Sequence, residues 1–168
     1  MMAEPMHGRP GETRLGFDPA AEPGDAHLVF IGRVHSPRTA ADCPKNLREA
    51  RVRLRTGSLA QPWLEIAPRF RLALTGLDAH AHILVLAWLD RARRDLAVLA
   101  KRHVAAPRGV LALRSPVRPN PIAVDIVRLL HVDVAAGRLD IDAIDLIDGT
   151  PLLDVKPYLA SVDAVGSE

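Results

Sequence analysis

The sequence of 168 residues contains a single cysteine, Cys43. One cysteine cannot form an internal disulfide, and its isolation excludes a zinc site built from several cysteine thiolates. No apolar run reaches the roughly 18 residues of a membrane-spanning helix, and the first ten residues lack the apolar core of a signal peptide. These absences predict a soluble, cytoplasmic protein that does not enter a membrane.

Aromatic residues make up only 4% of the chain, as three Phe, two Trp and one Tyr. This scarcity argues against a protein that binds single-stranded nucleic acid by stacking successive bases on aromatic rings. The sequence also lacks a Gly-x-Gly-x-x-Gly motif after a predicted strand, so it does not support a Rossmann-type methyltransferase. The net charge of +2 permits RNA binding without requiring it.

The residues that are present indicate one globular domain with a real core, since 48% are hydrophobic and 25% charged. Short apolar segments separated by Pro and Gly predict an all-β fold, mainly an antiparallel β-barrel with a few short peripheral helices. We expect a flexible N-terminal tail over residues 1–25, the barrel domain over 26–160 and a C-terminal tail over 161–168.

Apolar alternation and turn residues predict the individual elements. The predicted strands are 27–34, 52–55, 62–66, 80–88, 110–113, 122–134, 138–147 and 151–157. One or two helical turns are predicted over 69–74, and 91–106 fits either a short helix or a loop. Alternation breaks at 144–146, which predicts a bulge there.

The stretch from Arg108 to Val127 contains three prolines that fix the backbone between two predicted strands. Two arginines, a serine and an asparagine are thereby presented on a stiff connection, which favours a binding site over a plain hairpin turn. Such a set suits a carboxylate, a phosphate or a nucleotide. The four residues are Arg114, Ser115, Arg118 and Asn120.

Three motifs occur in the order Ile-Gly-Arg-Val-His-Ser-Pro at 31–37, Arg-Ser-Pro-Val-Arg-Pro-Asn-Pro-Ile at 114–122 and Asp-Gly-Thr-Pro-Leu-Leu-Asp-Val-Lys-Pro-Tyr at 148–158. Together they resemble the TsaA/TrmO-like family of S-adenosylmethionine-dependent tRNA methyltransferases, across residues 29–158. The family fold, a β-barrel with short peripheral helices that is commonly a dimer, agrees with the predicted fold. The resemblance implies S-adenosylmethionine as cofactor, tRNA as partner and a homodimer.

The resemblance also implies methylation of the N6 nitrogen of threonylcarbamoyl-adenosine beside the tRNA anticodon. Two other functions stay open: methylation of a small molecule, and a non-catalytic barrel that binds the cofactor or RNA. The residues implied for substrate and proton transfer are Arg118, Asn120, Asp145, Asp148, Lys156 and Tyr158. The residues implied for the cofactor are Cys43, Pro44, Lys45, Leu89, Asp90, Arg114, Ser115, Val124, Ala143, Ile144 and Asp145.

Several roles within this set stay alternatives. Arg118 with Asn120 would hold the threonyl carboxylate through paired hydrogen bonds. Asp145 or Asp148 would accept the proton, and Lys156 or Tyr158 would orient the acceptor. Lys156 could instead form a plain ion pair with Asp154, which lies two residues away on the same strand face.

The remaining polar clusters are less specific. His80 and His82 share one strand face without a third ligand nearby, so no metal site is predicted. Two basic clusters fit either solvated faces or phosphate contacts for RNA. They are Arg51, Arg53 and Arg55, and Arg91, Arg93, Arg94, Lys101 and Arg102.

Overall fold

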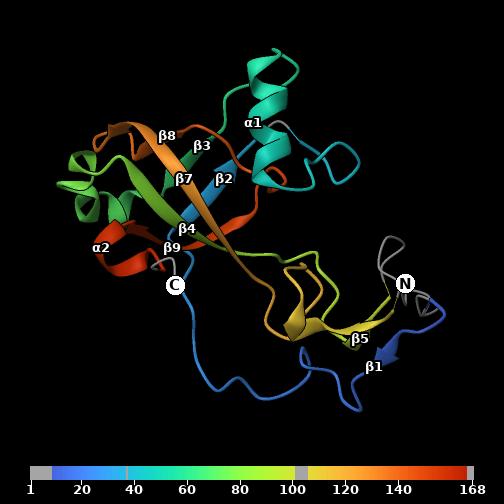
Figure 1. Ribbon diagram of the computed structural model, residues 1–168. Coiled ribbons are helices and arrows are strands. Elements are labelled where there is room, and N and C mark those ends of the chain that lie inside the picture. The colour runs from blue at the N-terminus through green and yellow to red at the C-terminus, as the bar shows by residue number, and fades with distance from the viewer. Residues whose placement is uncertain (1–8, 37, 101–105, 166–168) are drawn as a thin grey trace. The chain divides into compact units, whose positions relative to one another are not determined.

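The computed structural model describes residues 9–36, 38–100 and 106–165. The chain divides into two compact units, each with its own sheet. Unit 1 consists of Met1–His27 and Leu89–Ile122, and unit 2 consists of Leu28–Trp88 and Ala123–Glu168. Figure 1 shows the six barrel strands of unit 2, with α1 and α2 on opposite sides of the barrel.

The barrel closes in the strand order β2-β3-β8-β7-β4-β9. Its strands are β2 (Gly32–His35), β3 (Trp63–Ile66), β4 (His82–Trp88), β7 (Ile122–Asp133), β8 (Arg138–Ile141) and β9 (Pro151–Pro157). The pairs β2–β3, β2–β9, β3–β8, β4–β9 and β7–β8 are antiparallel. The all-β prediction is therefore confirmed, and closure leaves this sheet without an open edge.

Alternating side chains fill the interior of the barrel. Ile83, Val85 and Ala87 on β4 are fully buried, whereas the residues between them are partly exposed. Because neighbouring strand residues point to opposite faces, one set from every strand meets inside the barrel. The other fully buried strand residues are Val34, Leu64, Val127, Leu139, Ile141 and Leu152.

The helix α1 (Leu47–Arg55) replaces the strand predicted over 52–55, so that prediction is wrong. The side chain of Asn46 caps the helix by accepting the Glu49 N–H at 2.9 Å. Glu49 lies in the first turn and Arg53 and Arg55 in the last, which suits the helix dipole. The alternation of apolar and basic residues at 52–55 belongs to the last turn of this helix, which carries Arg53 and Arg55.

Two 3₁₀ helices, η1 (Pro68–Leu74) and η2 (Leu77–Ala79), follow β3. They confirm the helical turns predicted at 69–74, and Gly76 joins them with a φ of 81°, a left-handed value. The helix α2 (Ala160–Asp163) follows β9. None of the helices in the described part of the chain is long and apolar enough to span a membrane.

Unit 1 contains a three-stranded sheet in the order β1-β5-β6. Its strands are β1 (Thr13–Arg14), β5 (Leu96–Leu99) and β6 (Arg108–Gly109), and the 3₁₀ helix η3 (Val110–Ala112) follows. Leu96, Leu99 and Val110 form its core, with Leu113 and Val117 packed against them.

Three local predictions fail in unit 1, although part of this region, residues 101–105, lies outside the described residues. The strand predicted over 110–113 is η3, and 91–106 contains β5 rather than only a helix or a loop. β1 lies within the segment predicted as a tail, whose residues 1–8 are also outside the described ones. Short strands that pair across about 80 positions, such as Thr13 with Val98, leave no local signal.

The hairpin of β7 and β8 is confirmed, with Gly137 at a φ of 70° before β8. However, β8 ends at Ile141 instead of 147, and the register shift lies on β7, between Leu129 and His131. The carboxylate of Asp142 explains the early end, since it accepts the Arg128 N–H at 2.8 Å. The first strand also begins later than predicted, at Gly32.

Gly32→Ala is expected to destabilise unit 2, because an added Cβ would lie 1.8 Å from the Glu65 carbonyl oxygen on β3. The backbone of a paired strand cannot give way, so we expect the free energy of unfolding to fall by about 2 kcal/mol or more. Urea unfolding followed by tryptophan fluorescence measures this loss. Gly16→Ala is the control, since a Cβ there meets nothing within 4 Å. An unchanged urea midpoint for Gly32→Ala would contradict the pairing.

Candidate functional site

Two loops of unit 2 are joined by hydrogen bonds across more than 100 positions of sequence. The early loop, residues 38–46, follows β2, and the acidic loop, residues 142–150, connects β8 to β9. Next to the early loop, Ser36 Oγ donates to the Leu146 carbonyl at 2.6 Å, and the Ser36 N–H donates to Asp148 Oδ1 at 3.0 Å. The Asp148 N–H in turn donates to the Arg38 carbonyl at 3.0 Å. These bonds fix the two loops against each other.

The two loops bring together two groups of the predicted cofactor residues. Cys43 Sγ donates to the Asp145 carbonyl at 3.1 Å, next to the buried Ala143 and Ile144. Pro44 is buried, and Lys45 is exposed, with its N–H donating to Glu49 Oε2 at 3.1 Å. The structure therefore places the 43–45 segment beside the 143–145 segment, as the predicted site requires.

The thiol of Cys43 is held in its neutral form. Burial, followed by the nearby Asp145 carboxylate, raises the pKa of Cys43 to about 11. A neutral thiol is a hydrogen-bond donor and a poor nucleophile. Cys43 therefore supports the early loop and is not suited to covalent chemistry.

Arg38 was missed by the sequence analysis, although it follows directly after the Ile31–Pro37 motif. Its side chain is 2% exposed, and Nη1 donates to the Ile144 carbonyl at 2.8 Å. An arginine in a polar loop gives no sequence signal for burial, because arginines are almost never fully buried. The structure thus adds a buried cation between the two segments of the predicted cofactor site.

His35 was also missed, and it lies beside Asp148 on the outer face of the barrel. Its Nε2 lies 2.7 Å from Glu65 Oε2, and its Nδ1 lies 3.9 Å from Asp148 Oδ1. The ring stacks on Trp63 at a centroid distance of 3.9 Å, and the Arg138 guanidinium lies over the same indole at 4.3 Å. The carboxylate of Asp148, one candidate proton acceptor, therefore lies near the imidazole ring of His35.

Two further predicted residues lie on β9 or just after it. Lys156 Nζ is 2.8 Å from Asp154 Oδ2, which is the ion pair considered as an alternative. This hydrogen bond raises the pKa of Lys156, so its ammonium group stays charged. Tyr158 makes an edge-to-face contact with His82 at 6.5 Å between ring centroids. In the described residues, no three His, Cys, Asp or Glu side chains are grouped to hold a metal ion.

The proline-rich segment belongs to unit 1, where several internal hydrogen bonds hold it. Arg94 Nε donates to the Pro119 carbonyl at 2.6 Å, and the Leu89 N–H donates to the Pro121 carbonyl at 2.8 Å. Ser115 is buried and accepts the Val117 N–H at 3.4 Å. Arg118 is half-buried, with Nη1 at 3.5 Å from the Leu113 carbonyl.

The predicted cofactor residues are divided between the two units. Leu89, Asp90, Arg114 and Ser115 belong to unit 1. Cys43, Pro44, Lys45, Val124, Ala143, Ile144 and Asp145 belong to unit 2, as do Asp148, Lys156 and Tyr158. Arg118 and Asn120 lie with the first group.

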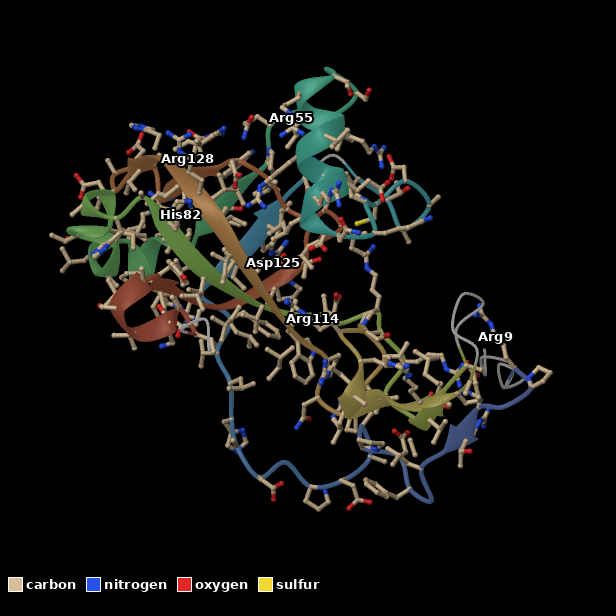
Figure 2. All side chains as sticks on the ribbon, in the orientation of Figure 1. Arg9, Arg55, His82, Arg114, Asp125 and Arg128 are labelled. Carbon is tan, nitrogen blue, oxygen red and sulfur yellow. The ribbon has the colours of Figure 1, made fainter. Side chains whose placement is uncertain are left out.

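The two basic clusters are partly used inside the units. Arg51 pairs with Asp142 at 2.7 Å and Arg53 donates to the Asp42 carbonyl at 2.7 Å, whereas Arg55 is exposed. Figure 2 shows Arg55 and Arg128 at the outside of unit 2.

In the second basic cluster, Arg93 pairs with Asp95 at 2.9 Å and Arg94 binds backbone carbonyls, while Arg91 is exposed. Lys101 and Arg102 lie outside the described residues. The exposed arginines are the ones suited to phosphate contacts.

A cavity of about 300 Å³ lies elsewhere in unit 2, between η1, η2 and β9. Most of its lining is apolar, including Ile31, Ile66 and Phe70, and His80 and Asp154 are among its few polar residues. It does not include the predicted cofactor residues.

Residues 36–164 match the protein family described as the tRNA-methyltransferase O N-terminal domain. The chain is 35% identical over 150 residues to the probable S-adenosyl-L-methionine-binding protein VirR of Rhizobium radiobacter, covering 86% of this chain and 80% of that protein. It is 44% identical over 105 residues to a probable S-adenosyl-L-methionine-binding protein of Archaeoglobus fulgidus, covering 62% of this chain and 28% of that one.

Two further relatives bear on the chemistry. A tRNA (adenine(37)-N6)-methyltransferase of Eikenella corrodens is 49% identical over 57 residues, which cover 33% of this chain and 32% of that enzyme. The crystal structure of TrmO from Pseudomonas aeruginosa matches with a TM-score of 0.62 at 33% identity, covering 86% of this chain and 61% of that one. The chain thus spans less than two thirds of that solved structure and of the Archaeoglobus relative.

Alkylation of Cys43 by iodoacetamide is expected to be roughly 100-fold slower at pH 8 in the folded protein than in urea, because thiolate is the reacting form and its pKa is raised. The rate in the folded protein should rise with pH until about 11, the pKa of the folded thiol. Mass spectrometry measures the rate without ambiguity, since the chain has one cysteine. Equal rates in folded and unfolded protein at pH 8 would contradict a thiol held by the Asp145 carbonyl.

Proposed function

Because this chain belongs to the tRNA-methyltransferase O N-terminal domain family, we propose that it binds S-adenosyl-L-methionine and methylates tRNA. The acceptor is the N6 nitrogen of threonylcarbamoyl-adenosine beside the anticodon. The observation that carries the proposal is the bonded pair of loops in unit 2, which sets the Cys43 segment beside Asp145. The name of the Eikenella relative supports the choice of acceptor, and the names of two other relatives support the cofactor.

The chemistry of the loops fits this cofactor. S-adenosylmethionine carries a sulfonium and an amino group, both positive, and a negative carboxylate. The acidic loop supplies Asp145 and Asp148, and the early loop supplies the buried cation Arg38. Cys43, Pro44 and Lys45 with Ala143, Ile144 and Asp145 would hold the cofactor from unit 2, and Val124 would join them. The resemblance also implies Leu89, Asp90, Arg114 and Ser115 for the cofactor, and these four belong to unit 1.

The proposed reaction depends mainly on orientation. The cofactor supplies a methyl group, and the acceptor nitrogen is a weak nucleophile because its lone pair is delocalised into the purine and the carbamoyl group. Arg118 would hold the threonyl carboxylate through two parallel hydrogen bonds, with Asn120 beside it. Fixing the substrate in this way would orient the nitrogen toward the methyl group that the cofactor supplies.

Loss of the nitrogen's proton requires an acceptor, and two carboxylates are available. Asp148 is exposed and lies near His35, while Asp145 is half-buried between the loops. Either one would act as general base at its exposed oxygen. Tyr158 or Lys156 would orient the acceptor, and the ion pair of Lys156 with Asp154 favours Tyr158.

Two alternatives are kept because several relatives are named only for S-adenosylmethionine binding. The chain could methylate a small molecule, or it could bind the cofactor or RNA without catalysis. Methyl transfer from labelled S-adenosylmethionine into bulk tRNA and into a small-metabolite fraction separates the three functions. Label in tRNA supports our proposal, label in metabolites supports the first alternative, and label in neither fraction supports the second.

A homodimer is part of the proposal, supported by the outer face of β7. Ile122, Val124 and Ile126 alternate along this strand and are exposed, and the exposed Leu130 follows them beyond the exposed Arg128. Outward residues of a barrel in water are usually polar, so an apolar row suggests a protein partner. A second copy of the chain is the partner that the family resemblance implies.

Ile126→Lys is expected to convert the dimer to a monomer, because it places a further charge among these exposed apolar side chains. Sedimentation velocity at micromolar concentration measures the assembly state. The matched control is Leu72→Lys, which changes an exposed leucine on η1. A wild-type protein that sediments as a monomer, or an unchanged dimer in the Ile126→Lys protein, would remove the proposed interface.

Arg118→Ala is expected to lower tRNA methylation by about 100-fold, the scale of losing a charge-assisted pair of hydrogen bonds. The affinity of the Arg118→Ala protein for S-adenosylmethionine, measured by calorimetry, should stay within a few-fold of wild type. Arg114→Ala should lower both tRNA methylation and the affinity for S-adenosylmethionine. Arg118→Lys should restore little activity, because an ammonium group lacks the fork geometry. Arg108→Ala, at an exposed arginine of the same unit, is the control. Unchanged methylation by the Arg118→Ala protein would remove the carboxylate role.

A further inference from the structure

Arg38 has donor groups that the protein itself does not use. Of its three guanidinium nitrogens, Nη1 donates to the Ile144 carbonyl at 2.8 Å. Nε and Nη2 are buried and have no hydrogen-bond partner among the residues that the structure describes. Buried polar groups almost always have partners, so two neighbouring donors without any suggest a ligand.

The two unused donors lie on the same edge of the guanidinium. The N–H bonds of Nε and Nη2 run nearly parallel, at a spacing that matches the two oxygens of a carboxylate. Nη1, which is bound to Ile144, points away from this edge. The free edge is therefore the one that binds carboxylates side-on, and the bond at Nη1 fixes its direction.

Nearby charges act on this edge of Arg38 in both directions, but none of them fills it with a hydrogen bond. Burial lowers the pKa of Arg38, and Arg53 lowers it further, while Cys43, Asp42 and Asp145 act in the opposite direction. Neither carboxylate is hydrogen-bonded to Nε or Nη2. Asp42 is instead bonded to Thr39, at 2.6 Å to its N–H and 2.8 Å to its hydroxyl.

We propose that the Nε and Nη2 edge of Arg38 binds a carboxylate, and that this is the carboxylate of the methionine part of S-adenosylmethionine. The inference rests on the proposed function, because it places the ligand between the 43–45 and 143–145 segments. Both nitrogens are covered, so the early loop must shift when the ligand enters. The bond from Cys43 to the Asp145 carbonyl is a weak one that can yield, since a thiol is a poor donor.

Two related ligands test the proposal by calorimetry. S-adenosylhomocysteine carries the carboxylate, and 5′-methylthioadenosine has the same adenosine thioether without it. Arg38→Met should lower the affinity for S-adenosylhomocysteine by about 100-fold and the affinity for 5′-methylthioadenosine by less than about three-fold. Arg38→Lys should recover only part of the affinity, because one ammonium group cannot replace the fork. Arg69→Met, at an exposed arginine on η1, is the matched control and should leave both affinities unchanged.

Labelling of wild-type Cys43 gives a second test that needs no variant. A carboxylate bound to Arg38 holds the methionine part of the ligand over the Cys43 segment, so saturating S-adenosylhomocysteine should slow alkylation of Cys43 by iodoacetamide. Saturating 5′-methylthioadenosine should slow it less. Equal protection by the two ligands would count against the proposal even if the Arg38→Met protein failed to fold.

The other outcomes of the calorimetric test also support or reject the proposal. If Arg38→Met lowered the affinities for both ligands equally, Arg38 would only hold the loops. If it lowered neither affinity, the Nε and Nη2 edge would bind no carboxylate. If only tRNA bearing the threonyl carboxylate lost affinity, the substrate would be the source, and the proposal would be wrong. Wild-type protein that bound neither ligand would overturn the proposed function itself, before any variant was compared.

Discussion

The close approach of β2 to β3 is the contact on which the rest of unit 2 depends. At Gly32 the backbone lies so near the Glu65 carbonyl that no side chain fits between them. This contact lets β2 pair with β3 on one side and with β9 on the other, which closes the barrel. Closure also fixes the direction in which the chain leaves β2, and Ser36 begins the hydrogen bonds to the acidic loop there. The site is thus built on the rigid end of a strand, where geometry is more exact than in a free loop.

The energetic character of the site follows from burying charge next to backbone carbonyls. Arg38 enters the interior with one donor satisfied by Ile144, and the neighbouring carboxylates offset only part of the cost of burying its charge, because burial lowers its pKa overall. Cys43, at the same point, stays protonated because burial and Asp145 disfavour its thiolate. A cation without full hydrogen bonding, held between acidic groups, is suited to a ligand that carries both signs of charge. Stability gives little reason for such an arrangement, whereas binding does.

The relatives place this chain in a family whose members are named for cofactor binding and for tRNA methylation. Unit 2 carries most of the implied cofactor residues, and the proline-rich segment of unit 1 carries Arg114 and Ser115. In unit 1 the stiffness comes from Pro119 and Pro121, whose carbonyls accept hydrogen bonds from Arg94 and Leu89. Within each unit, hydrogen bonds to backbone carbonyls therefore hold the segments that carry these residues.

The sequence by itself determined the elements whose signals are local. The alternation of β4, the hairpin of β7 and β8 with Gly137, and the β9 strand bounded by Pro151 and Pro157 could all be predicted from neighbouring residues. The kinds of side chain in the implied site, such as arginine and aspartate, could also be predicted from the sequence. The helix at 47–55 also has a local signal, the Asn46 cap with Glu49, which the sequence analysis did not use. The tertiary structure alone decided that β1 pairs with β5 and that Arg38 is buried beside Ile144. These depend on contacts between residues about 80 to 110 positions apart, and such contacts leave no periodicity in the sequence around either partner.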